Sequence, residues 1–426
     1  MTRIRGNATR SITEKRIKDS IYGNISISGQ ELRLIDTPIF QRLRQIKQLG
    51  ATDLVYPGAT HTRFSHSIGT MHIMGRFVDG AGRGRGKAAE APDEREKFRI
   101  AALLHDLGHY PFSHTTEGAV SKVFGGMDHE QFGGYLIRKF FAERLDSYKP
   151  SEIINVFTGR RKSPLLSSAL DADKADYLLR DSYNAGVPYG RVGLQRLLRT
   201  ISYVKGGIIF EKDEVAVENF LIGRYHMYRA VYHHKAVVSF NLMVGKIFEL
   251  LTTENYLPDP KDLIKSEDEY SLSGYTDGLV VACMHKYLET GRDGFLRSLI
   301  RLFLAREPLE SIYLNPQSSK PGGIPKETAA MLALAEDPTI TEGIAEAAGV
   351  DAREIFAIKM RPLSLIDEDT KIYVSNNGRP RSITESGGLI MNMIGSRTLY
   401  DARVYAMPGR SKAVAAALGK YLRKNL

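Results

Sequence analysis

The chain has 426 residues, 42% of them hydrophobic, which is enough to bury a large core in two or three structural units. Its 59 lysine and arginine residues exceed its 49 acidic ones, and the net charge of +10 favours anionic partners such as nucleotides, nucleic acid or acidic proteins. The single cysteine, Cys283, excludes an internal disulfide and a cysteine-based zinc cluster. The sequence shows neither a signal-peptide core nor a run of roughly 18 apolar residues, so we expect a soluble cytoplasmic protein with no membrane partner.

Helical periodicity dominates roughly the first 300 residues. The segment IDTPIFQRLRQIKQL, residues 35–49, predicts a helix that Asp36-Thr37-Pro38 opens. A second helix is expected from His66 to about Phe77. The glycine- and arginine-rich stretch that follows, around 80–93, is typical of a flexible loop between helices and, less often, of a nucleic-acid contact.

The next segment, residues 99–117, reads RIAALLHDLGHYPFSHTTE. It begins as an apolar helix and ends in the pair His105-Asp106. His109 follows four residues after His105, which is the same face of a helix, and His114 lies beyond the helix-breaking Pro111. Any one of these groups alone is more typical of a core histidine or a helix cap. Three of the 11 histidines in the chain fall within ten positions here, and this clustering favours a functional site.

Two later helices carry polar residues at intervals of four. A helix is expected over about 128–141, and the next begins near Asp173, where Asp173, Tyr177 and Asp181 would share one face beside Lys174. A carboxylate, a phenol and a second carboxylate do not make a packing face.

Residues 201–212 alternate and turn at 205–207, which predicts a short β-hairpin. A long helix, or two abutting helices, is expected over about 215–251. Its residues Arg224, Tyr228 and Tyr232 place a phosphate-binding guanidinium before two phenols, although tyrosines at this spacing are more often partly buried structure.

Beyond about residue 306 the pattern changes to short strands and helices, including 371–376, 403–407 and an amphipathic helix over 411–424. The expected fold is therefore mainly α. It would consist of a helical bundle with a small β-hairpin over residues 1–306 and a smaller α+β domain over residues 307–426 that serves accessory or oligomerisation contacts.

Four residues in predicted helices offer ligands for a catalytic divalent metal: His66, His105, Asp106 and Asp173. Imidazole and carboxylate together suit Fe, Mn, Zn, Co or Ni. A site with two imidazole and two carboxylate ligands leaves coordination positions open for water and substrate oxygens. Such open positions are what make a metal catalytic. The alternative is that each histidine is a satisfied core residue and each aspartate a cap or a solvated charge.

The motifs RFSHS, HDLGHYPFSH and LDADKADYLLRD resemble the HD-domain superfamily of metal-dependent phosphohydrolases. The longer run over residues 35–69 is similar to the deoxynucleoside triphosphate (dNTP) triphosphohydrolases, including the vertebrate members that join a SAM domain to the HD domain. The resemblance extends from about Lys15 to the C-terminus and weakens after about residue 306.

The resemblance implies an HD helical bundle that binds the metal through the four residues above. It also implies that the triphosphate, with its Mg²⁺, is held by Arg63, His109, Lys174 and Arg224, and that the catalytic residues are His114, Glu117 and His129, of which His129 matches another active-site histidine. Water activated by the metal would attack the α-phosphorus and release a deoxynucleoside and inorganic triphosphate. His114, oriented by Glu117, would protonate the leaving 5′-oxygen or activate the in-line water; the sequence leaves both open.

The sugar end of the substrate is implied in the same way. Gln48, Tyr177 and Asp181 match groups that read the 3′-hydroxyl, while Leu49 and Tyr232 match groups that pack where a 2′-hydroxyl would be, so ribonucleotides would clash. Tyr228 stands where the vertebrate pattern has a histidine, which leaves the base preference open.

The resemblance further implies regulation. Lys15, Asp36 and Arg44 match residues that bind a guanine-nucleotide activator between subunits, so a homo-oligomer, a dimer or a tetramer, is expected. Asp36 as a helix cap and Arg44 as a surface charge are the alternatives.

Two other classes of function stay open from the sequence. One is an HD phosphohydrolase for a ribonucleotide, a nucleoside monophosphate or an alarmone. The other, suggested by the positive charge, is a nucleic-acid-binding protein or nuclease that uses the same metal.

Overall fold

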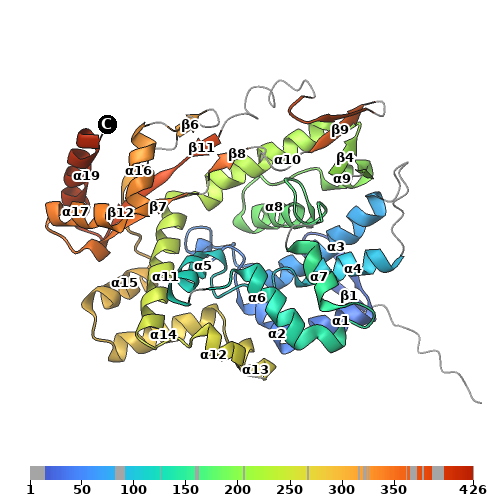
Figure 1. Cartoon of the computed structure of the whole chain (residues 1–426), viewed down its shortest axis with the longest axis horizontal. Coiled ribbons are helices and arrows are strands. Elements are labelled where there is room, and N and C mark those ends of the chain that lie inside the picture. Colours follow the sequence, from blue (N-terminus) through green and yellow to red (C-terminus); the bar gives the residue numbers. More distant parts are fainter. Residues whose placement is uncertain are drawn as a thin grey trace, which may run out of the picture.

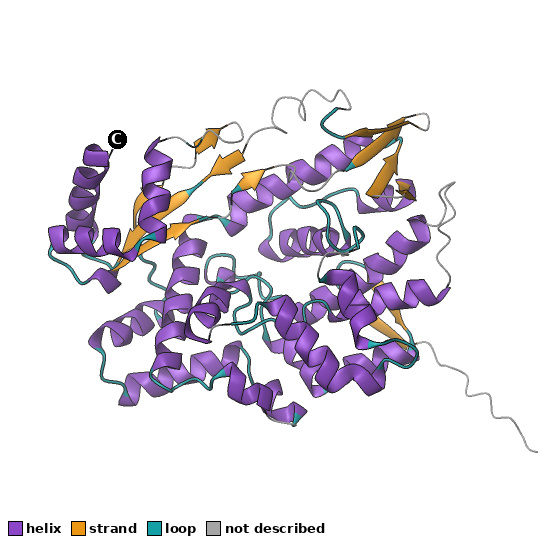
Figure 2. Ribbon diagram, in the orientation of Figure 1, coloured by secondary structure: helices purple, strands orange, loops and turns teal. Residues whose placement is uncertain are grey.

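The computed structural model describes residues 15–81, 92–124, 126–158, 163–204, 207–265, 268–314, 317–319, 324, 326–360, 362–364, 372–376, 379–385 and 398–425. The fold is mainly α with a few small sheets, as predicted (Figure 1, Figure 2). The α-helices are α1 (Gly29–Ile35), α2 (Pro38–Gln41), α3 (Arg63–Ala81), α4 (Pro92–Leu104), α5 (His114–Phe124), α6 (His129–Leu136), α7 (Pro150–Phe157), α8 (Ala172–Ala185), α9 (Leu194–Thr200), α10 (Glu214–Met227), α11 (Lys235–Thr253), α12 (Pro260–Lys265), α13 (Glu269–Ser273), α14 (Asp277–Thr290), α15 (Gly294–Leu304), α16 (Lys326–Glu336), α17 (Pro338–Ala348) and α19 (Ser411–Asn425).

Short turns of other helix types and the strands complete the description. The 3₁₀ turns are η1 (Arg42–Gln45), η2 (Thr52–Leu54), η4 (Ala142–Arg144) and η6 (Ala352–Glu354), and the π turns are η3 (Ile137–Phe141) and η5 (Tyr228–Tyr232). The strands are β1 (Lys15–Asp19), β2 (Gly23–Ile27), β3 (Ile201–Val204), β4 (Gly207–Glu211), β5 (Glu310–Leu314), β6 (Gln317–Ser319), β7 (Ile355–Lys359), β8 (Leu363–Ser364), β9 (Tyr373–Asn376), β10 (Arg379–Ser382), β11 (Thr398–Tyr400) and β12 (Ala402–Ala406).

The prediction of a single helix over residues 35–49 is wrong. α1 ends before Asp36, and α2 starts at Pro38, where the Thr37 hydroxyl, rather than Asp36, caps it by accepting the Phe40 N–H at 3.3 Å. After η1 the chain becomes extended, because the Lys47 N–H bonds to a distant carboxylate, Asp277, at 3.0 Å instead of to the preceding turn.

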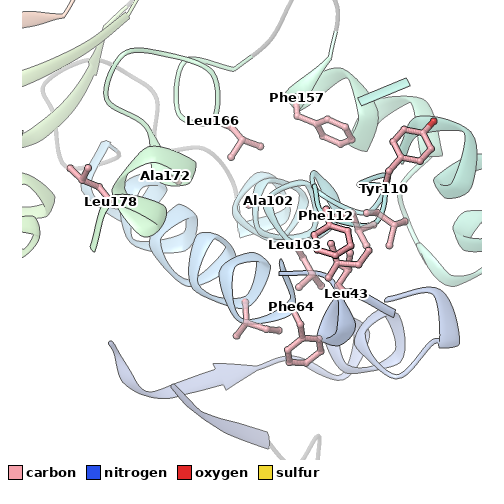
Figure 3. Packing of buried hydrophobic residues seen from close by; sticks show 14 of the residues in the cluster. Leu43, Phe64, Ala102, Leu103, Tyr110, Phe112, Phe157, Leu166, Ala172 and Leu178 are labelled. Carbon is pink, nitrogen blue, oxygen red and sulfur yellow. The ribbon is translucent and has the colours of Figure 1, made fainter. Parts of the chain in front are cut away.

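Helices α3, α4 and α8 contribute to the large hydrophobic core, and α3 contacts both of the others. Figure 3 shows part of this core, in which Leu43, Phe64, Leu103 and Phe112 come from four different segments. Helix α3 begins at Arg63, earlier than predicted. The predicted loop around 80–93 lies mostly outside the described residues, between the end of α3 and the start of α4.

Helix α4 ends at Leu104, immediately before the His105-Asp106 pair, so the expected shared helical face of His105 and His109 is wrong. The next residues form turns: the His109 N–H donates to the Asp106 carbonyl at 3.2 Å, and Gly108 packs so closely on α6 that an added Cβ would lie 2.1 Å from the His129 carbonyl oxygen. The backbone at Gly108 thus packs closely against α6, and α4 does not continue for another helical turn.

The predicted helix over 128–141 is present as α6 and η3, and the long region 215–251 is two abutting helices, α10 with η5 and then α11. Among the described residues, helix α11 is the one helix that is long and apolar enough, with a mean hydropathy of 1.4, to reach across a membrane. It is instead a core helix that packs against α5 and α15. The cytoplasmic location stays a prediction.

The predicted hairpin is present as β3 and β4, but strands from the C-terminal part extend it. β9 pairs in parallel with β4 and antiparallel with β10, giving the order β10-β9-β4-β3. The predicted strands at 371–376 and 403–407 and the last helix are present as β9, β12 and α19. A separate hydrophobic cluster joins α16, α17 and α19 to β12, whereas β9 and β10 lie beside β4 at the other end of the molecule (Figure 1). The domain boundary at residue 306 stays a prediction.

Candidate active site

The four predicted metal ligands come together. His66 lies in α3, His105 and Asp106 follow the last residue of α4, and Asp173 lies in the first turn of α8. The Nε2 atom of His66 is 3.0 Å from Asp173 Oδ1 and 3.5 Å from Asp106 Oδ2, and His105 Nε2 is 3.2 Å from Asp106 Oδ1. Two imidazole nitrogens and two carboxylates therefore face one another.

The orientation of both histidine rings fits a cation. His66 Nδ1 bonds to Asp176 Oδ2 and His105 Nδ1 to the Ala102 carbonyl, each at 2.8 Å, so both Nε2 atoms face the cluster. Although Asp106 Oδ1 lies 3.2 Å away, the buried Nε2 of His105 forms no hydrogen bond of suitable geometry with any described residue. Burial alone would lower the pKa of His66, but hydrogen bonds to Asp173 and Asp176 raise it to about 10, so the cluster stabilises positive charge. This donor set fits Fe, Mn, Zn, Co or Ni.

The carboxylate of Asp176, which the sequence analysis missed, anchors His66 to the fold. Arg180 donates to it from Nε at 2.8 Å and from Nη2 at 2.9 Å, and a second Arg180 amine reaches Asp19 at 2.9 Å. Gly69 leaves room for this group, since an added Cβ would lie 1.9 Å from Asp176 Oδ1. Burial would raise the pKa of Asp176, but Arg180 and His66 lower it to about 2.

We expect Asp176→Asn to lower the affinity for the metal by about 10- to 100-fold, the usual effect of removing a carboxylate that orients a histidine ligand. Metal content after dialysis against graded chelator concentrations measures this. Asp79→Asn, which changes an exposed pair with Arg95, is the matched control. Equal metal retention in the two variants would show that Asp176 does not support the site.

Asp106 stays ionised although it is buried. Burial alone would raise its pKa, but Arg63 and two neighbouring histidines hold it well below its usual range. Arg63 Nη1 is 2.7 Å from Asp106 Oδ2, while Nε donates to Ser113 Oγ at 2.9 Å and Nη2 to the Gln48 carbonyl at 3.3 Å. Arg63 thus ties the metal-ligand cluster to the loops that carry Gln48 and His114.

A second group of histidines shares one carboxylate. Glu117 Oε2 accepts from His114 Nδ1 at 2.8 Å, as the spacing predicts, and Oε1 lies 2.5 Å from His129 Nδ1. Burial would raise the pKa of Glu117, but these two bonds hold it well below its usual range. Because Glu117 occupies Nδ1 of each ring, and no hydrogen bond to either Nε2 is present within the described ranges, Nε2 can give or accept a proton. His114 is 62% exposed and lines the cavity.

His109 lies beneath this second group and is not among the residues that line the cavity. Its ring is 1% exposed and stacks on His129 at a centroid distance of 4.2 Å. Its Nε2 is 3.2 Å from Asp106 Oδ1. This position lets His109 connect the metal-ligand cluster to the His114 group, and its predicted contact with the triphosphate stays a prediction.

Both groups border a cavity of about 590 Å³, a volume that suits a small-molecule ligand. Its walls include residues of α3, α5, α6, α7, α8, α10, α11 and η5 and of the loops after η1 and α4. The predicted substrate-binding residues that line it are Gln48, Leu49, Arg63, Lys174, Tyr177, Asp181, Arg224, Tyr228 and Tyr232. The structure therefore brings together every residue of the predicted substrate set except His109.

Lys174 supplies a fixed positive charge at one end of this cavity. Its Nζ lies 2.9 Å from Asp171 Oδ2, and Asp171 also caps α8 by accepting the Lys174 backbone N–H. Burial would lower the pKa of Lys174, but Asp171 and Asp173 raise it. Arg224 lines the same cavity from α10, with its guanidinium 5.7 Å from the Tyr228 ring.

The other end holds a carboxylate whose two oxygens are already bonded. Tyr232, on the π turn η5, donates to Asp181 Oδ2 at 2.6 Å, and His61 Nε2 lies 2.7 Å from Asp181 Oδ1. His61 is buried and was missed from the sequence, although it precedes Arg63 and His66 in the same motif. Asp181 is thus held in one orientation and can accept a further hydrogen bond from a ligand hydroxyl.

The three predicted regulatory residues lie away from the cavity. Lys15 is exposed at the start of β1, and Asp36 is the exposed C-terminal cap of α1. Arg44 is exposed, donates to Gln41 at 2.6 Å and stacks 3.5 Å from the centroid of the Phe64 ring. None of the three lines the catalytic cavity, so their binding of a nucleotide between subunits stays a prediction.

Comparison with protein families agrees with this geometry. A model described as HD domain matches residues 63–181, and one described as HD associated region matches residues 192–283. The uncharacterized protein YwfO of Bacillus subtilis is 34% identical over 322 residues, which are 71% of this chain and 73% of YwfO.

A deoxynucleoside triphosphate triphosphohydrolase SAMHD1 homolog from Dictyostelium discoideum is 32% identical over 278 residues, 60% of this chain and 54% of that protein. The chain spans about half the length of several curated relatives that it matches. A crystal structure of a phosphohydrolase from Bacteroides thetaiotaomicron covers 92% of this chain and 99% of its own at a TM-score of 0.71 and 24% identity, which shows a shared fold.

Proposed function

The chain belongs to the HD-domain phosphohydrolase family, and from this premise we propose that it hydrolyses deoxynucleoside triphosphates to a deoxynucleoside and inorganic triphosphate. One observation carries the proposal: a metal-ligand cluster, two cations and an oriented carboxylate border the same 590 Å³ cavity. The SAMHD1 relatives, named as deoxynucleoside triphosphate triphosphohydrolases, support the choice of substrate.

The residues that line the cavity would bind the two ends of the substrate separately. Lys174 and Arg224 would bind the triphosphate, whose negative charge needs fixed positive partners. Asp181 would accept a hydrogen bond from the sugar 3′-hydroxyl, while Leu49 and Tyr232 would fill the space of a 2′-hydroxyl. A dNTP bound in this way would have its α-phosphorus between the metal-ligand cluster and His114.

A divalent cation held by His66, His105, Asp106 and Asp173 would supply the Lewis acidity that activates water for attack on the α-phosphorus. His114 then has its Nε2 free, because Glu117 accepts the Nδ1 proton. From that atom His114 would protonate the leaving 5′-oxygen. Glu117 would hold the ring in place and stabilise its positive charge before the transfer.

Incubation of the metal-loaded protein with each dNTP and NTP, followed by identification of the phosphate product, tests this function. We expect triphosphate from deoxynucleotides and at least about tenfold slower turnover of ribonucleotides. Release of orthophosphate or pyrophosphate would favour another HD phosphohydrolase activity. Salt-dependent binding of single strands without hydrolysis of any free nucleotide would favour a nucleic-acid partner.

We also propose that a guanine nucleotide activates the enzyme by binding at Lys15, Asp36 and Arg44 between subunits of a homo-oligomer. The exposure of all three residues, away from the catalytic cavity, supports a separate site. The same incubation with and without GTP, combined with light scattering, tests it. Unchanged rate and unchanged mass on addition of GTP would contradict it.

A further inference from the structure

The two residues before His114 have a backbone conformation that only glycine adopts easily. Phe112 has φ +60° and Ser113 has φ +57°. Phe112 is 3% exposed and its ring packs edge-on against Phe303, so the turn cannot relax by moving into solvent. Contacts with the rest of the fold must therefore hold this turn in place.

One carboxylate supplies such a contact and reaches a second loop at the same time. Asp277, the first residue of α14, accepts the Phe112 N–H on Oδ1 at 2.7 Å and the Lys47 N–H on Oδ2 at 3.0 Å. Ser113 closes the link by donating from Oγ to the Lys47 carbonyl at 2.7 Å. The loop that leads into Gln48 and the turn that leads into His114 are thus joined through Asp277.

A buried guanidinium joins the same segment to the metal side of the site. Arg42, 2% exposed, donates to the Tyr275 carbonyl at 3.1 Å and to the carbonyls of Leu107 and His109 at 2.9 Å each. The segment at the start of α14 is therefore linked to the loop over residues 107–113 at two places, through Arg42 at Leu107 and His109 and through Asp277 at Phe112. None of the four metal ligands bonds to Asp277.

We propose that Asp277 is a positioning residue for catalysis, which holds the His114 turn and the Gln48 loop at their distances across the cavity. The proposal rests on the hydrolytic function proposed above. It also gives a role to the HD-associated region, residues 192–283, which contains Asp277 and whose end lies against the catalytic loops. The metal ligands stand on α3, α8 and the end of α4, and the two hydrogen bonds of Asp277 described above go to Lys47 and Phe112, so we expect the metal site to survive substitution of Asp277.

Asp277→Asn separates positioning from folding. Asparagine keeps one acceptor oxygen and turns an N–H donor towards the other backbone N–H, so one of the two loops is released. We expect kcat for dNTP hydrolysis to fall about 10- to 100-fold, since a displacement of 1 Å costs up to about 10²-fold. KM should change less than about threefold and the metal content should be unchanged.

Two further variants make the result specific. Asp277→Glu keeps both acceptor oxygens and should recover most of kcat. Asp213→Asn is the control, because Asp213 is also buried in the HD-associated region and pairs with Arg196 at 2.7 Å without lining the cavity. Equal kcat in the Asn and Glu variants, or loss of bound metal in the Asn variant, would overturn the proposal.

Amide hydrogen exchange tests the positioning without any substrate. Peptides that cover residues 107–116 should exchange faster in Asp277→Asn than in the wild-type protein or Asp213→Asn. If the wild-type protein turns over no dNTP, the proposed function fails while this measurement still decides the positioning. Unchanged exchange in residues 107–116 would overturn the positioning role whatever the activity.

Discussion

Asp106→Asn is expected to lower dNTP turnover by at least about 10⁴-fold, which corresponds to ~5.5 kcal/mol of lost transition-state stabilisation. The change removes one negative charge and one anionic ligand from a cluster in which Asp106 lies 3.2 Å from His105 and 3.5 Å from His66. It also leaves the buried Arg63 without its 2.7 Å partner. Metal analysis should show less than one-tenth of the wild-type content.

The matched control is Asp146→Asn, because Asp146 is half exposed and pairs only with the surface residue Arg33 among the described residues. This variant should keep full activity and full metal content, since exposed pairs contribute at most about 1 kcal/mol to stability. An Asp106→Asn protein that binds no metal but still turns over dNTPs would contradict the assignment of the metal site.

His114→Ala is expected to lower kcat by about 10²- to 10⁴-fold while the metal content stays at the wild-type value. The reason is that His114 is bonded to Glu117 and to none of the four metal ligands. The leaving 5′-oxygen of a nucleoside is a poor leaving group without a proton. Removal of the imidazole that would protonate it therefore slows the chemical step.

A substrate with sulfur in place of the bridging 5′-oxygen separates the two roles of His114. A thiolate leaves without protonation, so His114→Ala should cost less than about tenfold on this substrate if His114 is the acid. An equal loss on the oxygen and sulfur substrates would instead indicate that His114 activates the attacking water. His285→Ala, which changes an exposed histidine of α14, is the control and should leave both rates unchanged.

The polar residues on one face of α8 could be predicted because their alignment depends only on that segment being helical. Residues four apart share a face once the segment is helical, and Asp173, Tyr177 and Asp181 all line the cavity. The metal ligands were predictable for a different reason. Each histidine or aspartate alone could be a core residue or a helix cap, but the cluster of histidines around His105 marked the place.

The supporting residues could not be predicted because their partners are far away in the sequence. His66 and Asp176 are separated by 110 residues, His61 and Asp181 by 120, and Phe112 and Asp277 by 165. The same cause explains the failed helix over 35–49, where the distant carboxylate of Asp277 takes the Lys47 N–H. Local propensity carries no information about such acceptors.

Some signals were nevertheless available. Asp176 stands three residues after Asp173 on the same helix, and His61 precedes Arg63 in the motif that was singled out. A polar residue within one helical turn of a proposed ligand is the first candidate for orienting it. By contrast, nothing near Asp277 in the sequence distinguishes it from a residue that caps a helix.

Hydrolysis of dGTP in ¹⁸O-labelled water, followed by phosphorus NMR and mass spectrometry of both products, tests the central claim most directly. Attack on the α-phosphorus with loss of the 5′-oxygen predicts one ¹⁸O atom in inorganic triphosphate and none in deoxyguanosine. Labelled deoxyguanosine monophosphate with unlabelled pyrophosphate, or label only in orthophosphate, would contradict the account.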